Sequence, residues 1–182
     1  MKLFLVLALA LLGAVSARQI HEGHLKQEGT AEQDEVKPGE PEPPCPTESE
    51  SFRMTVPGEE GRTYRYVAVN NCQTFWNADK LCARCYRGRL ASIHSESVNQ
   101  KLRNVARCRT NQGQVWIGGT TFHLFWHVNC SWIDRSHWNY SNWAHGNPHR
   151  RFLWKKCVAL STSGGHWRNI GCSTSMPFIC EY

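Results

Sequence analysis

The sequence predicts a single α+β domain over residues 63–182, and two observations indicate it. First, these residues hold all eight tryptophans and eight of the nine cysteines, which suits one compact domain cross-linked by disulfide bonds. Second, two helical patterns open this part of the chain and several short strand-like runs follow them. Helices followed by a series of strands are typical of the α+β class.

The N-terminus has the features of a signal peptide, which we assign to residues 1–17. Lys2 precedes the apolar run LFLVLALALLGA, which is too short to span a bilayer. The small residues Val15, Ser16 and Ala17 then provide a cleavage site. We therefore expect a secreted protein whose cysteines form disulfide bonds in an oxidising compartment.

Residues 18–62 are rich in Glu, Pro and Gly and poor in apolar residues, so we expect an acidic, disordered propeptide there. Their formal net charge is −6, whereas residues 63–182 carry +11. Such an asymmetry favours a polyanionic partner for the basic domain and a masking role for the acidic leader. Proteolysis near Arg62 would then release the full positive field.

The first elements of the domain follow from residue types and spacing. Bulky residues alternate over Tyr64–Val69, which predicts a strand. Thr74 suits the N-cap of a helix that runs to Cys85, and Ser95 suits the N-cap of a second helix. The apolar residues of this second helix recur at three- and four-residue spacing, at Val98, Leu102, Val105 and Ala106.

The second half of the domain reads as strands between long loops. Short apolar runs are bounded by polar, turn-rich segments, as expected for strands. These runs are VWIGG (Val115–Gly119), SWI (Ser131–Ile133), CVAL (Cys157–Leu160) and PFICEY (Pro177–Tyr182).

A family resemblance is carried by eight short motifs in order, WNADKLC, GRLASIHS, VWIGG, SWIDRSHWNYSNW, GNPH, CVALS, HWRNIGC and PFICEY. Together they resemble a C-type lectin domain. CARCYRGRLASIH, NQGQVWIGG and the GGHWR segment more closely resemble the bone marrow proteoglycan family, which includes eosinophil major basic protein. The resemblance implies a C-type lectin-like fold with two core disulfides, Cys82–Cys180 and Cys157–Cys172.

Two features depart from that family. Tyr64 stands where its members tend to have a cysteine, and the prosegment is shorter and less acidic than theirs. The resemblance otherwise implies a non-enzymatic cationic defence protein that is stored in leukocyte granules, binds heparan sulfate and damages membranes. We therefore expect glycosaminoglycans and anionic membrane surfaces as partners, no cofactor, and no nucleic acid as a physiological target. The absence of GxSxG, HExxH and phosphate-binding glycine motifs agrees with a non-enzymatic protein.

Calcium-dependent sugar binding needs six to eight oxygen ligands, several of them carboxylates. The two triplets that resemble the calcium-binding triplets of lectins read Asn147-Pro148-His149 and Trp167-Arg168-Asn169, with no carboxylate in either. Arg168 would add a permanent positive charge. We therefore expect no metal at this position and keep a calcium-dependent lectin as an alternative function.

The stretch GNPHRRFLWKKC starts at the first of these triplets and is strongly basic. We expect its cations to gather with Arg168 where lectins gather acids, because Arg and Lys bind sulfate and carboxylate groups. A second basic stretch, ARCYRGR, would extend the surface, although each single cation is most simply a solvated surface residue. The predicted polyanion-binding residues are Arg150, Arg151, Lys155, Lys156, Arg168, Arg84, Arg87 and Arg89.

Most tryptophans are expected in the core, including Trp116, Trp132, Trp143 and Trp167. Trp154 lies beside lysines in the basic loop. A buried loop anchor is the first interpretation, whereas an exposed ring there would contact the membrane interface.

Five cysteines remain after the two implied bridges: Cys45, Cys72, Cys85, Cys108 and Cys130. An odd remainder indicates a free thiol or a bridge to another molecule, with Cys45 as one residue that would tie the leader to a partner. A disulfide-linked protein partner, such as a protease held in an inhibited complex, is therefore a further alternative. Asn129 and Asn139 lie in sequons and are candidate glycosylation sites, the first only if Cys130 is not bridged.

Overall fold

The computed structural model describes residues 42–57, 61–124, 127–149 and 154–182 of the 182-residue chain. The expected signal peptide, residues 18–41 of the expected propeptide, and Arg150 and Arg151 lie outside these residues. All described residues belong to one unit that spans residues 36–182. In the described part, no helix combines the length and the apolar character needed to cross a membrane.

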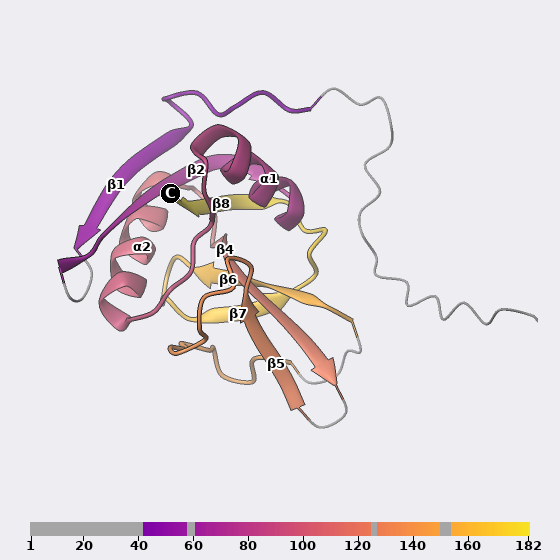
Figure 1. The fold of residues 1–182 in the computed structure, drawn as a ribbon. Coiled ribbons are helices and arrows are strands. Elements are labelled where there is room, and N and C mark those ends of the chain that lie inside the picture. The colour runs from indigo at the N-terminus through magenta and orange to yellow at the C-terminus, as the bar shows by residue number, and fades with distance from the viewer. Residues whose placement is uncertain (1–41, 58–60, 125–126, 150–153) are drawn as a thin grey trace, which may run out of the picture. The chain divides into compact units, whose positions relative to one another are not determined.

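An eight-stranded sheet forms the centre of the domain. Its neighbouring strands, in spatial order, are β1 (Ser51–Pro57), β2 (Thr63–Gln73), β8 (Met176–Glu181), β4 (Gln114–Leu124), β6 (Lys156–Ser161) and β7 (Trp167–Ile170). The short β3 (Arg89–Leu90) pairs with β8, and β5 (His127–Trp132) pairs with β4. Figure 1 shows β4 and β5 as a long hairpin that extends away from the two helices.

The two helices cover opposite faces of this sheet. Successive residues of β2 alternate between two hydrophobic clusters, because neighbouring side chains of a strand point to opposite faces. Tyr66 packs with residues of α2 (Glu96–Arg109), whereas Val67 packs with residues of α1 (Phe75–Tyr86). We call these the α2 face and the α1 face. Their separate cores explain why the strand residues are buried on both sides.

The predicted helices and strands are present with small shifts of their ends. Ser95 caps α2 as expected, because its hydroxyl accepts a hydrogen bond from the Val98 N–H over 3.3 Å. Thr74 precedes α1 at the expected place, but its side chain makes no cap hydrogen bond, which corrects that detail. Strands β1, β3 and β7 were not predicted from the sequence.

Strand β1 corrects the boundary of the expected disordered propeptide. All seven of its residues pair antiparallel with β2, from Ser51 opposite Val69 to Pro57 opposite Thr63. Val56 is 1% exposed in the α2-face core, and Met54 packs against the same cluster. Residues 51–57 thus bury apolar side chains and form a ladder, which offsets their ordering entropy. The folded part therefore begins before residue 63.

Three disulfides join the described residues. Cys82–Cys180 links α1 to β8, and Cys157–Cys172 closes the region around β7, as the family resemblance implied. The third, Cys45–Cys85, was not predicted. It connects the segment before β1 to α1, so Cys45 is not a spare cysteine for a partner. Cys82 and Cys85 form a CxxC motif in sequence, but each is bridged to a different strand or segment.

Candidate polyanion-binding surface

The long loop between β5 and β6 comprises residues 133–155, of which 133–149 and 154–155 are described. It is anchored on Trp167 of β7. The main-chain N–H of Trp167 donates to the Asn142 carbonyl over 2.7 Å, and the main-chain N–H of Ala144 donates to the Trp167 carbonyl over 2.9 Å. Four rings pack edge-to-face against the fully buried Trp167 indole, at centroid distances of 5.5 to 5.8 Å, from Trp132, Trp138, Tyr140 and Trp143. The loop is therefore positioned by an aromatic cluster on the α2 face.

The two would-be calcium triplets meet through Asn169, which is 5% exposed. Its Oδ1 accepts the His149 N–H over 2.8 Å, and its Nδ2 donates to Thr121 Oγ1 over 3.2 Å. The Asn169 N–H in turn donates to Asn147 Oδ1 over 3.4 Å. The side-chain oxygens of both asparagines thus serve internal hydrogen bonds that fasten the long loop to β7. With no carboxylate in either triplet, this arrangement does not fit the oxygen-rich shell that calcium prefers.

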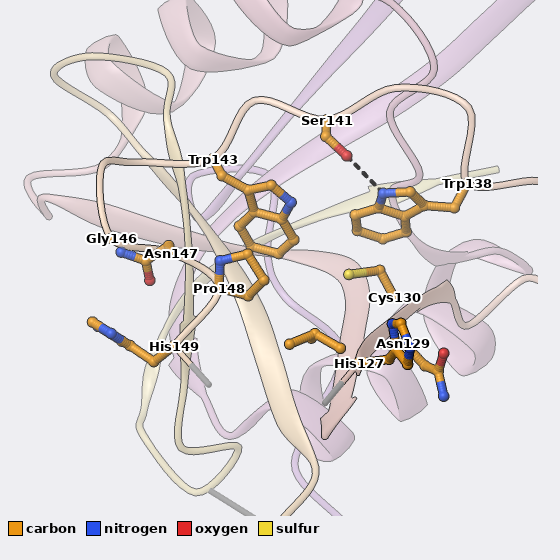
Figure 2. Close-up of a pocket in the computed structure, with 11 residues that line it drawn as sticks. His127, Asn129, Cys130, Trp138, Ser141, Trp143, Gly146, Asn147, Pro148 and His149 are labelled. Atoms are coloured by element: carbon orange, nitrogen blue, oxygen red, sulfur yellow. Dashed lines mark hydrogen bonds between the residues drawn. The ribbon is translucent and has the colours of Figure 1, made fainter. Parts of the chain in front are cut away.

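A hollow of about 780 Å³ lies between β5 and the long loop. Figure 2 shows the indoles of Trp138 and Trp143 along it, with the Cys130 thiol pointing into it and Pro148 nearby. The two indoles stack with their centroids 5.9 Å apart. None of the described lining residues is Lys, Arg, Asp or Glu. None of the predicted polyanion-binding residues that the structure describes therefore lines this hollow.

Strand register places the cations of the predicted surface on different faces. Arg168 pairs with Ala159, whose side chain belongs to the α1-face core, whereas Asn169 pairs with Val158 of the α2-face core. Because paired residues share a face of the sheet, Arg168 points away from Asn169 and the would-be calcium position. The expectation that Arg168 adds its charge to that position is wrong.

The two lysines of the basic stretch, Lys155 and Lys156, also lie on different faces of the sheet. Lys155 Nζ lies 4.8 Å from the ring centroid of Trp76 on α1, a cation–π contact on the α1 face. Lys156 pairs with Thr121, which hydrogen-bonds Asn169 on the α2 face. Lys155 and Arg168 are both exposed on the side of the sheet that α1 covers. Lys155 contacts α1 through a residue that the sequence reasoning did not consider, Trp76.

The second predicted stretch lies at the end of α1. Arg84 and Arg87 are exposed, and Arg87 ends the helix in a left-handed conformation with φ of 58°. Arg84 forms an ion pair with Glu42 and also donates to the Pro43 carbonyl. The Arg89 guanidinium forms a bidentate ion pair with Asp79, in which Nε donates to Oδ1 over 2.9 Å and Nη2 donates to Oδ2 over 2.7 Å. Arg89 therefore has a structural partner within the domain, and its part in polyanion binding stays a prediction.

Trp154 is 67% exposed, whereas Trp116, Trp132 and Trp167 are buried as expected. Trp143 is half-buried and lines the hollow. The interpretation of Trp154 as a buried loop anchor is therefore wrong. An exposed indole next to Lys155 has the composition of a membrane-interface contact.

The few carboxylates of residues 63–182 are used within the domain. Asp79 holds Arg89, and Glu96 accepts from Tyr140 and Gln100. Ser92 lies between the other two: its Oγ is 2.7 Å from Asp134 Oδ2 and 3.2 Å from Glu181 Oε2. Only Asp79 of these four acids forms an ion pair among the described residues. The positive charge of the surface is thus largely uncompensated by the domain's own acids.

Glu181 provides a pH-dependent prediction. Its burial raises the pKa of its carboxyl, opposed by hydrogen bonds from Ser92, and Asp134 nearby raises it further. The folded state therefore holds this proton more tightly than the unfolded chain does, so the contribution of Glu181 to stability falls as pH rises from the unfolded pKa to the folded one. We expect Glu181→Gln, which retains a hydrogen-bond acceptor, to raise the thermal midpoint at pH 7.5 but not at pH 3. Thermal melts followed by circular dichroism test this, and a lower midpoint for the variant at pH 7.5 would contradict it.

Three described cysteines are free: Cys72 and Cys108 are exposed, and Cys130 is partly buried. Burial raises the pKa of the Cys130 thiol to about 11, which keeps it protonated and poorly reactive at neutral pH. Asn129 and Asn139 are both exposed, as glycosylation requires. Because Cys130 is not bridged, Asn129 meets the condition for a candidate glycosylation site.

Residues 71–182 match the family of lectin C-type domains. Among curated relatives, mouse (Mus musculus) proteoglycan 3 is 42% identical over 76% of this chain, and rat (Rattus norvegicus) bone marrow proteoglycan is 41% identical over 88%. Eosinophil granule major basic protein 1 from guinea pig (Cavia porcellus) is 39% identical over 76%. The matches cover 60%, 68% and 58% of these three relatives, respectively.

The fold is also found in solved structures. Human lithostathine superposes with a TM-score of 0.58 at 24% identity, over 66% of this chain and 84% of that one. At that identity the likeness concerns the fold alone. The domain match, the relatives and the arrangement of helices, sheet and disulfides agree, and the chain belongs to the C-type lectin family, in its bone marrow proteoglycan and eosinophil major basic protein group.

Proposed function

We propose that this chain is a secreted, granule-type cationic defence protein that binds polyanions without calcium and damages target membranes after release from its acidic propeptide. The partners in this proposal are heparan sulfate, other glycosaminoglycans and anionic lipid surfaces. Support for storage in leukocyte granules comes from the name of the guinea pig relative, an eosinophil granule protein.

The observation that carries the proposal is the distribution of charge. Residues 63–182 have a formal net charge of +11, and their acids are engaged with internal partners. Lys155 and Arg168 are exposed on the α1 face. A surface of this kind attracts sulfate and phosphate groups by counterion release, and its affinity falls steeply with salt.

Heparin chromatography tests the proposal directly. We expect the secreted protein to be retained, to elute at high salt, and to elute at the same salt concentration in the presence of EDTA. Arg168→Gln should elute earlier. Arg65→Gln is the matched control, because Arg65 is an exposed arginine on β2, at the other end of the sheet from β7, and the charge change is the same.

Two results would contradict this function. Elution by EDTA would favour the calcium-dependent lectin, which should also bind neutral sugar columns when calcium is present. An equal shift for Arg168→Gln and Arg65→Gln would show a response to net charge without a defined surface. The hydrogen bonds that occupy Asn147 and Asn169 argue against the lectin alternative.

Trp154 gives a separate prediction for membrane damage. Transfer of a large aromatic side chain out of water contributes about 1.5–3 kcal/mol, so loss of this ring should weaken vesicle binding by about tenfold or more. We expect Trp154→Ser to reduce dye leakage from phosphatidylserine vesicles. Its heparin elution should remain unchanged, because no charge is removed. Unaltered leakage would exclude Trp154 from the membrane contact.

A disulfide-linked partner remains a second candidate function, favoured by the exposed thiols of Cys72 and Cys108. An exposed thiol in an oxidising compartment readily forms intermolecular bridges. Non-reducing electrophoresis of the secreted protein from its source tissue should then show a high-mass complex that disappears on reduction. The same complex should be lost in Cys72→Ser or Cys108→Ser.

A further inference from the structure

The C-terminal half of α1 presents a basic surface. Arg84 is exposed there, and so are Lys80 one turn before it and Arg87 just after the last residue of the helix, whereas Asp79, the one acid of this helix, is buried and engaged by Arg89. Nothing on the helix itself therefore offsets the three exposed charges. The side chains at this end of α1 are suited to hold a carboxylate or sulfate.

The chain's own leader already places an acid on this surface. Glu42 forms an ion pair with Arg84, and the same guanidinium donates to the Pro43 carbonyl. Glu42 is itself highly exposed, with 74% of its side chain accessible, so the contact is made at the surface and not in the core. Guanidinium binds a carboxylate and a neighbouring carbonyl together in this way because its donors form a planar fork.

This acidic segment is fastened at its C-terminal end. The Cys45–Cys85 disulfide attaches it to the residue next to Arg84. Beyond it, the Asn70 N–H donates to the Glu50 carbonyl over 2.8 Å, and Arg53 of β1 lies 5.5 and 5.6 Å from the ring centroids of Tyr86 and Tyr182. The seven-residue ladder between β1 and β2 completes the attachment.

We infer that the C-terminal half of α1 is an anion-binding surface whose built-in occupant is the leader segment Glu42–Cys45, and that the Cys45–Cys85 disulfide keeps this occupant in place when the chain is cut between β1 and β2. The inference deepens the proposed function and rests on it for the identity of the competing polyanion. Cleavage near Arg62 then yields a two-chain molecule in which Arg84 stays paired with Glu42. Freeing Arg84 from this carboxylate requires loss of the disulfide as well, or a cut between Glu42 and Cys45.

The test uses the full-length secreted chain with a site-specific protease sequence inserted after Pro57. Phenylglyoxal labels accessible arginines, and mass spectrometry of peptides gives the labelling rate of each. Arg65, exposed on β2, serves as the internal reference. The comparison is between the intact chain, the cut chain, and a cut Cys45→Ser/Cys85→Ser double variant, which leaves no new thiol.

We expect the cut wild-type chain to keep its N-terminal fragment on a non-reducing gel and to release it after treatment with a dithiol, which reduces the disulfide to two thiols and becomes a cyclic disulfide itself. Arg84 should label several-fold more slowly than Arg65 in the intact and cut wild-type chains. It should approach the Arg65 rate in the cut double variant. Added heparin should then protect Arg84 again in that variant.

Two outcomes would overturn the inference: labelling of Arg84 at the Arg65 rate in the intact chain, or separation of the fragment from the cut wild-type chain without reduction. A third outcome concerns the proposed function alone. If Arg84 becomes accessible in the cut double variant but heparin gives no protection, the result supports the leader segment as the occupant of this surface and contradicts polyanion binding there.

Discussion

Trp167→Ala is expected to lower the free energy of unfolding by about 3–5 kcal/mol, the usual cost of removing a buried tryptophan side chain. The ring is fully buried, and its Nε1–H donates to Asn99 Oδ1 over 2.8 Å. Removing it leaves the buried Asn99 oxygen without this donor, and it takes away the common neighbour of four aromatic rings. The cost is large compared with the 5–15 kcal/mol that typically stabilises a domain.

The effect should also reach the long loop. Tyr140 and Trp143 pack against the α2-face core next to Trp167, so their near-ultraviolet circular dichroism should weaken in the variant. Trp154→Ala is the matched control, because it makes the same chemical change at a residue that is 67% exposed. Its stability should change by less than about 0.5 kcal/mol. Equal denaturant midpoints for the two variants would contradict the anchoring role of Trp167.

The helices and most strands could be predicted because their apolar spacing is regular. Strand β1 was missed although its sequence also alternates, with Phe52, Met54 and Val56 separated by polar residues. The acidic, proline-rich composition around it outweighed this short signal. Composition is averaged over a segment, whereas a strand needs only a few apolar residues and a neighbour with free backbone groups, here β2.

The family resemblance supplied two disulfide pairs, but the Cys45–Cys85 bridge lay outside the motifs that carry it. Arg168 shows a different limit. It was assigned by its position in the Trp167-Arg168-Asn169 triplet, but side chains alternate along a strand, so Arg168 points to the face opposite that of Trp167 and Asn169. A prediction of β7 as a strand would therefore have placed Arg168 on the other face. The Lys155 contact with Trp76 had no such signal, because it joins elements far apart in the sequence.

The three disulfides should stabilise the domain in the order of their loop lengths. A disulfide restricts the unfolded chain, and the entropic effect grows with the number of residues enclosed. The separations are 98 residues for Cys82–Cys180, 40 for Cys45–Cys85 and 15 for Cys157–Cys172. Loss of these bridges is therefore expected to cost about 4.7, 3.9 and 3 kcal/mol in that order.

Paired Cys→Ala variants measured by urea unfolding test this order, because a double replacement leaves no unpaired thiol. Cys82, Cys157 and Cys180 are fully buried, so small cavities add to the cost of replacing the Cys82–Cys180 and Cys157–Cys172 pairs. The informative comparison is between the other two. If Cys45→Ala/Cys85→Ala costs less than Cys157→Ala/Cys172→Ala, the segment before β1 contributes little to the folded domain. A larger cost would show that this part of the leader is held as firmly as the lectin-like core itself.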